Sequence, residues 1–250
     1  MNNNLNRLID HTNLNIDATK ADIQKLVREA IEFNFNSICV RANWLEEFAK
    51  AYRVSVVSSF PENVFNVSKT DEVKQIIGNA HADEKFAEVS KIIRQGASEI
   101  DPVINISKLE QLHEEMDIYY EAVMQEKRPV IIKPIFSCEI LSDEELEFSI
   151  AKYSDYAKRN QEDKIKYCYK NSTGFIKSNN PELLKTSSVK LVTAINKYFE
   201  LYDPMQLVAI KIAGGVRSVA DIENFQAILQ ERLSHIGTSS GADIFSFSAN

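Results

Sequence analysis

The sequence predicts a (β/α)8 TIM barrel, an α/β fold, formed as a single domain by residues 1–250. Eight short strand-like runs alternate with helix-like runs, and repeated strand–helix units form parallel strands joined by crossover helices. A length of 250 residues suits one such barrel. No GxGxxG motif follows the first strand, whereas open dinucleotide-binding sheets carry one at that place. No Pro/Gly/Ser-rich linker divides the chain, which indicates one domain.

The strand-like runs are short and rich in aliphatic and β-branched residues, as strands buried between helices require. They cover residues 7–11, 36–40, 54–60, 99–105, 129–135, 165–170, 207–213 and 233–237. The first is the least typical, because its carboxyl end is polar.

Amphipathic segments with apolar residues at i, i+3 and i+4 lie between most of these strands. They cover residues 18–35, 82–97, 108–126, 142–160, 181–199 and 218–233. Several begin with helix-start signals: Ser142 precedes two acidic residues, Asn180 precedes a proline, and Ser218 stands three residues before Asp221.

The composition excludes several classes of protein. A net charge of −7 and a pI near 5.3 argue against a nucleic-acid partner, because proteins that bind nucleic acid present a basic surface. No run of 18 apolar residues exists to span a membrane, and the amino terminus lacks the layout of a secretion signal. Three cysteines without CxxC spacing predict neither a disulfide framework nor a metal site, and favour a reducing cytoplasm.

Glycine is concentrated at one end of the chain. Of seven glycines, five follow the last three strands: Gly174, Gly214, Gly215, Gly237 and Gly241. These loops share one rim of a barrel, where late loops often bind phosphate through backbone N–H groups. The pattern favours an anion site; the alternative is that these are merely tight turns.

Strand alternation places Lys170 near the end of its strand and Lys211 at the corresponding place on the next. Two ammonium groups about 4 Å apart would repel by roughly 4 kcal/mol at an effective dielectric near 20, which would lower one pKa by several units. A neutral lysine can form a Schiff base with a carbonyl, and Asp101 could move protons beside it. The alternative is that both lysines are solvated rim residues, as Lys133 at another strand end suggests.

The segments LIDHTNL, EIDPVIN, YKNSTGF, AIKIAGGVRS and HIGTSSG together resemble the deoxyribose-phosphate aldolase family, from about residue 5 to residue 243. The resemblance implies a class I aldolase on a (β/α)8 barrel. Its expected reaction is the reversible cleavage of 2-deoxy-D-ribose 5-phosphate into D-glyceraldehyde 3-phosphate and acetaldehyde, with no metal and no organic cofactor.

The resemblance also assigns roles by motif. Lys170 corresponds to the Schiff-base lysine, Lys211 to the lysine that lowers its pKa, and Asp101 to the proton-relay carboxylate. Positions expected to bind the substrate and its phosphate, or to line the site, are Thr173, Gly174, Gly214, Gly215, Ser239, Ser240, Asp10, Thr12 and Cys39.

Several positions depart from the family pattern. Asn171 stands where threonine is usual, Pro102 where an aliphatic residue is usual, and Lys133 at the place of a glutamate. The segments SSFPENVFNVSKTDEVK and IIKPIFSCEIL are lengthened, and the chain ends in IFSFSAN without the tyrosine of some relatives.

Two alternatives to this aldolase remain open from the sequence. One is a Schiff-base aldolase on the same scaffold that acts on another phosphorylated sugar. The other is a weakened descendant that binds a sugar phosphate without turnover, for which the three substitutions are the support. Because relatives are often dimers, a homodimer is the assembly that the resemblance suggests.

Overall fold

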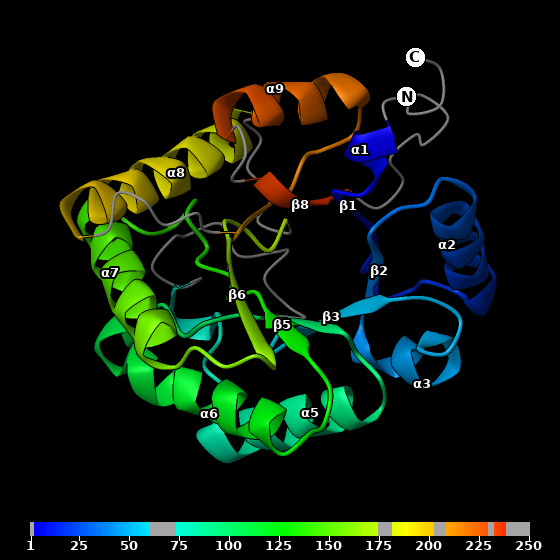
Figure 1. Cartoon of the computed structure of the whole chain (residues 1–250), viewed down its shortest axis with the longest axis horizontal. Coiled ribbons are helices and arrows are strands. Elements are labelled where there is room, and N and C mark those ends of the chain that lie inside the picture. Colours follow the sequence, from blue (N-terminus) through cyan, green and yellow to red (C-terminus); the bar gives the residue numbers. More distant parts are fainter. Residues whose placement is uncertain (1–2, 61–73, 175–181, 203–208, 230–232, 239–250) are drawn as a thin grey trace.

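The structure is a computed structural model that describes residues 3–60, 74–174, 182–202, 209–229 and 233–238. Eight parallel strands form a closed barrel, in which each strand pairs with the next along the chain and β8 pairs with β1. Helices surround the strands as an outer ring (Figure 1). The predicted (β/α)8 barrel is confirmed.

All eight predicted strands are present, although several end earlier than predicted. They are β1 Ile9–Asn13, β2 Ser37–Val40, β3 Val54–Ser58, β4 Glu99–Pro102, β5 Val130–Ile132, β6 Ile165–Lys170, β7 Ala209–Ala213 and β8 Leu233–Gly237. Strand β1 lies two residues later than predicted, because its polar end pairs with β2: Asp10 stands beside Ser37 and Thr12 beside Cys39.

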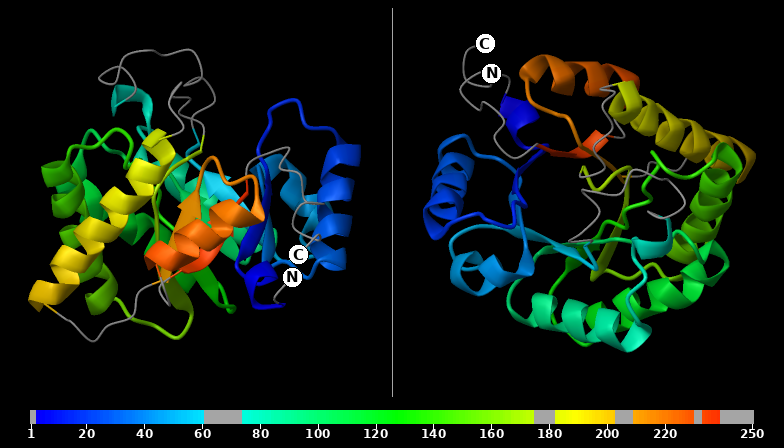
Figure 2. Two further views of the ribbon diagram at one scale, coloured as in Figure 1. Left: turned by 90° about the horizontal axis from the view of Figure 1, so that it is seen from above. Right: turned by 180° about the vertical axis from the view of Figure 1, so that it is seen from behind.

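The six predicted amphipathic segments form helices. They are α2 Lys20–Glu32, α5 Ala82–Arg94, α6 Leu112–Met124, α7 Asp143–Arg159, α8 Glu182–Tyr202 and α9 Val219–Leu229, and the short 3-10 helix η3 Leu109–Gln111 precedes α6. Figure 2 shows that α7 and α8 (green and yellow) lie across the barrel from α2 (blue). No helix in the described part of the chain is both long and apolar enough to cross a membrane.

Among the elements that the structure describes in full, three short helical segments were not predicted: α1 Asn3–Asn6, the 3-10 helix η1 Ala42–Trp44 and α3 Leu45–Phe48. The last two connect β2 to β3. A single helical turn contains too few residues to show a 3.6-residue period, so the sequence pattern could not reveal them.

Two of the helix-start signals act as predicted. The Ser142 hydroxyl accepts from the Glu145 amide, and the Glu145 carboxylate accepts from the Ser142 amide, which caps α7. Ser218 and Asp221 make the same exchange before α9. Asn180 lies outside the described residues.

The core has an apolar outer layer and a polar interior. Aliphatic strand residues such as Ile9 and Ile100 belong to one hydrophobic cluster that includes the buried faces of the helices. Their sequence neighbours Asp10 and Asp101 are also fully buried. Because successive side chains of a strand point to opposite sides, these carboxylates face the inside of the barrel.

Candidate active site

The structure brings together the three residues expected to carry the chemistry. Lys170 and Lys211 are register partners on neighbouring strands β6 and β7, and Asp101 projects from β4. Asp101 Oδ2 accepts hydrogen bonds from both lysines, at 2.7 Å from Lys170 Nζ and 2.8 Å from Lys211 Nζ. All three side chains are almost completely buried. The alternative of two solvated rim lysines is wrong for this pair.

The pKa values of the two lysines are shifted in opposite directions. Burial lowers the pKa of Lys170 below its ordinary value, the Lys211 charge lowers it further, and Asp101 only partly opposes them. Burial alone would also lower the pKa of Lys211, but the Asp10 and Asp101 carboxylates raise it well above its ordinary value. Sequence reasoning named repulsion as the cause of the Lys170 shift, whereas burial is the larger cause.

Asp101 is held as a carboxylate. Burial alone would raise its pKa, but Lys170, Lys211 and Lys133 lower it far below the ordinary range. The Ser55 hydroxyl donates to Asp101 Oδ1 at 2.7 Å, which fixes the plane of the carboxylate. Asp101 can therefore accept a proton without having to lose one first.

Lys133 is buried among carboxylates of β1 and β4, contrary to its interpretation as a solvated strand-end lysine. Its side chain is completely buried. Its Nζ donates to Asp10 Oδ2 at 2.8 Å, forms an ion pair with Glu99 Oε2 and lies 3.8 Å from Asp101 Oδ1. Because three carboxylates surround it, the pKa of Lys133 is raised although burial opposes this.

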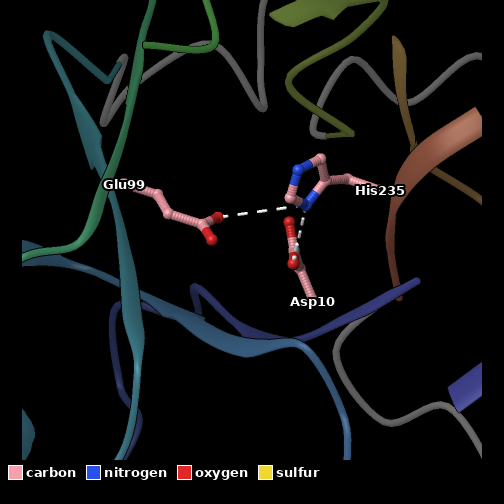
Figure 3. A group of neighbouring side chains, drawn as sticks. All are labelled: Asp10, Glu99 and His235. Carbon is pink, nitrogen blue, oxygen red and sulfur yellow. Dashed lines mark hydrogen bonds and ion pairs between the residues drawn. The ribbon is translucent and has the colours of Figure 1, made fainter. Parts of the chain in front are cut away.

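Asp10, Glu99 and His235 point toward one another from β1, β4 and β8 (Figure 3). Their ligand-type atoms lie within 4.8 Å of one another, a spacing that could hold a metal ion. However, Lys133 Nζ already contacts both carboxylates, and Lys211 Nζ lies 2.7 Å from Asp10 Oδ2. The positive charge at this place is therefore supplied by ammonium groups.

The glycine-rich loops after β6 and β7 lie against each other. Gly174, Gly214 and Gly215 all have positive φ, at 75°, 95° and 70°. A Cβ atom on Gly174 would come 3.3 Å from Gly214 Cα, so glycine permits this close approach. Thr173 is buried beside them. Ser239, Ser240 and Gly241 lie outside the described residues.

A family model described as DeoC/LacD family aldolase matches residues 6–247. The chain belongs to this family. It is 32% identical to deoxyribose-phosphate aldolase 1 of Mesoplasma florum, covering 96% of this chain and 94% of that protein, and 30% identical to the deoxyribose-phosphate aldolase of Natranaerobius thermophilus, covering 99% of both.

Solved structures share the barrel of this DeoC/LacD family member. A deoxyribose phosphate aldolase from Aeropyrum pernix, described as tetrameric, superposes with a TM-score of 0.70 at 23% identity, covering 99% of this chain and 92% of that one. A putative deoxyribose-phosphate aldolase from Coccidioides immitis gives 0.72 at 22% identity, with 99% and 87% covered. At these identities the likeness concerns the fold.

Two further predicted positions of the DeoC/LacD chain, Cys39 and Thr12, are register partners on β2 and β1. Cys39 is buried with Leu14 and Val57, and the charges of both site lysines act on its thiol, although burial raises its pKa overall. Thr12 is half-buried, and its hydroxyl donates to the Asp10 carbonyl at 2.8 Å.

Two departures from the family pattern are accommodated by local bonding. Asn171 is buried: its amide nitrogen donates to Ser187 and Ser188 of α8, and its oxygen accepts from the Ala213 amide at 2.8 Å. It therefore joins β6, β7 and α8 beneath the glycine loops. Pro102 cannot donate, but its carbonyl accepts from the Ile135 amide at 2.8 Å, so strand pairing continues beside Asp101.

Sequence reasoning missed three other polar groups of this aldolase site. Glu99 and His235 stand two residues from Asp101 and Gly237, so strand alternation could have placed both inside the barrel. Glu139 follows β5, and its carboxylate accepts a hydrogen bond from the Ser172 hydroxyl at 2.8 Å. The Ser172 hydroxyl oxygen in turn accepts a hydrogen bond from the Gly174 amide at 2.9 Å. No strand pattern marks Glu139, because it lies in the lengthened loop.

Proposed function

We propose that this chain is a class I aldolase that reversibly cleaves 2-deoxy-D-ribose 5-phosphate into D-glyceraldehyde 3-phosphate and acetaldehyde through a Schiff base on Lys170. The observation that carries the proposal is the shared carboxylate oxygen of Asp101, which holds a buried Lys170 of lowered pKa beside a charged Lys211. Relatives of nearly the same length that are named deoxyribose-phosphate aldolase support the choice of substrate.

The first half of the reaction uses Lys170 as a nucleophile. Its uncharged Nζ attacks the C1 aldehyde of the open-chain sugar and forms a carbinolamine, which loses water to give a protonated imine. The imine withdraws electrons from the C2–C3 bond. Removal of the C3 hydroxyl proton, by Asp101 directly or through one water, then breaks this bond and releases glyceraldehyde 3-phosphate.

The second half restores the enzyme. The two-carbon enamine left on Lys170 takes a proton at C2, and water hydrolyses the resulting imine to free acetaldehyde and the amine. Lys211 remains charged throughout, so its field favours the neutral form of Lys170 and stabilises negative charge that develops near it. The imine itself accepts the electron pair, and the sequence of steps therefore needs no cofactor.

The glycine loops are proposed to bind the distant phosphate. Positive φ values at Gly174, Gly214 and Gly215 turn the backbone sharply at the carboxyl ends of β6 and β7. The Gly174 amide donates to Ser172, so the N–H groups of Gly214 and Gly215 are the ones proposed to face the anion. Thr173, Ser239 and Ser240 are proposed to contribute hydroxyls. Binding energy from a phosphate that does not react would orient C1 toward Lys170.

A coupled assay for glyceraldehyde 3-phosphate release from deoxyribose 5-phosphate tests the proposal. We expect turnover that a chelator leaves unchanged, and slower turnover with ketose phosphates at equal concentration. Preferred cleavage of a ketose phosphate would indicate another Schiff-base aldolase. Binding of deoxyribose 5-phosphate without turnover would indicate a sugar-phosphate-binding protein, an alternative that the intact contacts of Lys170, Asp101 and Lys211 disfavour.

We also propose that the enzyme is cytoplasmic and forms a homodimer. Three free, buried cysteines suit a reducing compartment. The dimer rests on the family resemblance, and light scattering of the purified chain would distinguish it from a monomer or a tetramer.

A further inference from the structure

Lys133 faces the same carboxylate as the proposed nucleophile, but at the other oxygen. Lys170 and Lys211 both bond to Asp101 Oδ2, whereas Lys133 faces Asp101 Oδ1 at 3.8 Å. Its shorter contacts are with Asp10 Oδ2 and Glu99 Oε2. Lys133 is thus placed to act on Lys170 through charge, with the carboxylates between them.

The charges of this cluster balance when Lys170 is neutral. Three buried carboxylates face three cations: Lys133, Lys211 and Arg53, whose guanidinium reaches Glu99 Oε1 at 2.5 Å from the outside. This balance concerns the lysine, arginine and carboxylate groups; His235 Nδ1 lies 3.3 Å from Asp10 Oδ1. In the described part of the chain, the titratable groups facing the cluster from the strands are Asp10, Cys39, Glu99, Asp101, Lys133, Cys168, Lys170, Lys211 and His235.

An unbalanced charge in a buried cluster is costly, because water cannot screen it. Lys170 is the basic group left over after the three carboxylates have been matched, so it is the one that gives up its proton. The directions of the pKa shifts agree, since burial lowers the pKa of Lys170 while the carboxylates raise those of Lys133 and Lys211.

We propose that Lys133 is a positioning residue for the aldolase reaction: its permanent charge neutralises Asp10 and Glu99, and this leaves Lys170 as the uncharged amine. The inference rests on the proposed function. Without Lys133, three carboxylates would face two cations, and Lys170 would bind a proton to restore the balance. Lys133 therefore controls the nucleophile without touching the substrate.

Three variants test the sign of this effect through the pH dependence of kcat/KM. Lys133→Met removes a cation and should therefore favour the protonated form of Lys170. The acidic limb of the profile should then move to higher pH by about one unit, with roughly tenfold lower turnover at neutral pH. Glu99→Gln removes an anion and should move the limb down. The double variant removes one charge of each sign and should return the limb close to the wild-type position.

Circular dichroism and thermal melting establish which variants fold. Should Lys133→Met fail to fold, the downward shift of Glu99→Gln and the wild-type-like profile of the double variant still decide the question. If the wild type is active, the role of Lys133 would be overturned by acidic limbs of Lys133→Met and Glu99→Gln that stay at the wild-type pH, or that both move to higher pH. Absence of turnover in the wild type would instead refute the proposed function, before any variant is compared.

Discussion

At the residue scale, the proposed chemistry depends on how Lys170 and Lys211 share one oxygen of Asp101. Two ammonium groups that bond to one carboxylate oxygen repel each other, and this repulsion favours the neutral form of one of them. Burial acts in the same direction on Lys170 and is the larger cause of its lowered pKa. The pKa of Lys211 is raised instead, because Lys211 contacts the Asp10 carboxylate at 2.7 Å in addition to that of Asp101.

Lys211→Leu tests this division of roles. Removing its charge should raise the pKa of Lys170, so that turnover at pH 7 falls by about 100-fold and recovers in part above pH 9. The measurement is a pH profile of deoxyribose 5-phosphate cleavage. Lys166→Leu is the matched control, since Lys166 is exposed at the start of the same strand as Lys170. Turnover of the Lys211 variant equal to that of wild type would refute its role.

Glu139 gives a second residue-scale prediction, concerning stability. Burial raises the pKa of Glu139 from 4.5 to about 7, against the hydrogen bond from Ser172. Below pH 4.5 the carboxyl is protonated in both the folded and the unfolded chain. Between pH 4.5 and 7 the unfolded chain loses the proton while the folded chain keeps it, so the free energy of unfolding falls as pH rises.

Glu139→Gln should therefore be more stable than wild type by about 3 kcal/mol at pH 8 and should lose this advantage at pH 4. Urea denaturation at both pH values measures the difference. The control is Glu121→Gln, which alters an exposed glutamate on α6 and should show no such dependence. If the free energy of unfolding changed with pH in the same way in wild type and in the Glu139 variant, the raised pKa of the folded-state Glu139 carboxyl would be contradicted.

At the element scale, the site depends on the contact between the loops that follow β6 and β7. Gly174 adopts a φ of 75° and packs against Gly214, while Asn171 ties the same two strands to α8. The loops therefore form one supported surface, as a rigid anion site requires.

Gly174→Ala should disturb this surface. A left-handed conformation is unfavourable for alanine by roughly 1 kcal/mol, and the added methyl would press on Gly214. We expect KM for deoxyribose 5-phosphate to rise about tenfold, with a smaller change in kcat. Gly96→Ala, at a φ of 115° after α5, should lower stability without changing KM. An unchanged KM in the Gly174 variant would argue against phosphate binding at this loop.

The elements were predictable where a pattern extends over several residues. Helix α2 and strand β6 follow from clear periodicity, and the start of α7 follows from Ser142. The turn of α3 was missed because four residues carry no period. Strand β1 was displaced because its polar residues resemble a loop until β2 is seen to pair with them.

At the scale of the whole molecule, closure of the barrel creates the charge cluster. Asp10 on β1 meets His235 on β8 because the first and last strands pair, and both approach Lys211 on β7. Lysine at a strand end is usually solvated, so Lys133 by itself gave no signal of burial. Its place depends on Glu99 and Asp10, which are distant in sequence and become its neighbours only in the closed barrel.

Reductive trapping with borohydride is the most direct test of a Schiff base on Lys170. The enzyme is mixed with deoxyribose 5-phosphate or acetaldehyde, reduced, digested and analysed by mass spectrometry. We expect a two-carbon adduct on Lys170 with loss of activity, and no adduct at this position in Lys170→Met or without substrate. An active preparation with unmodified Lys170, or an adduct on Lys133 or Lys211 instead, would contradict it.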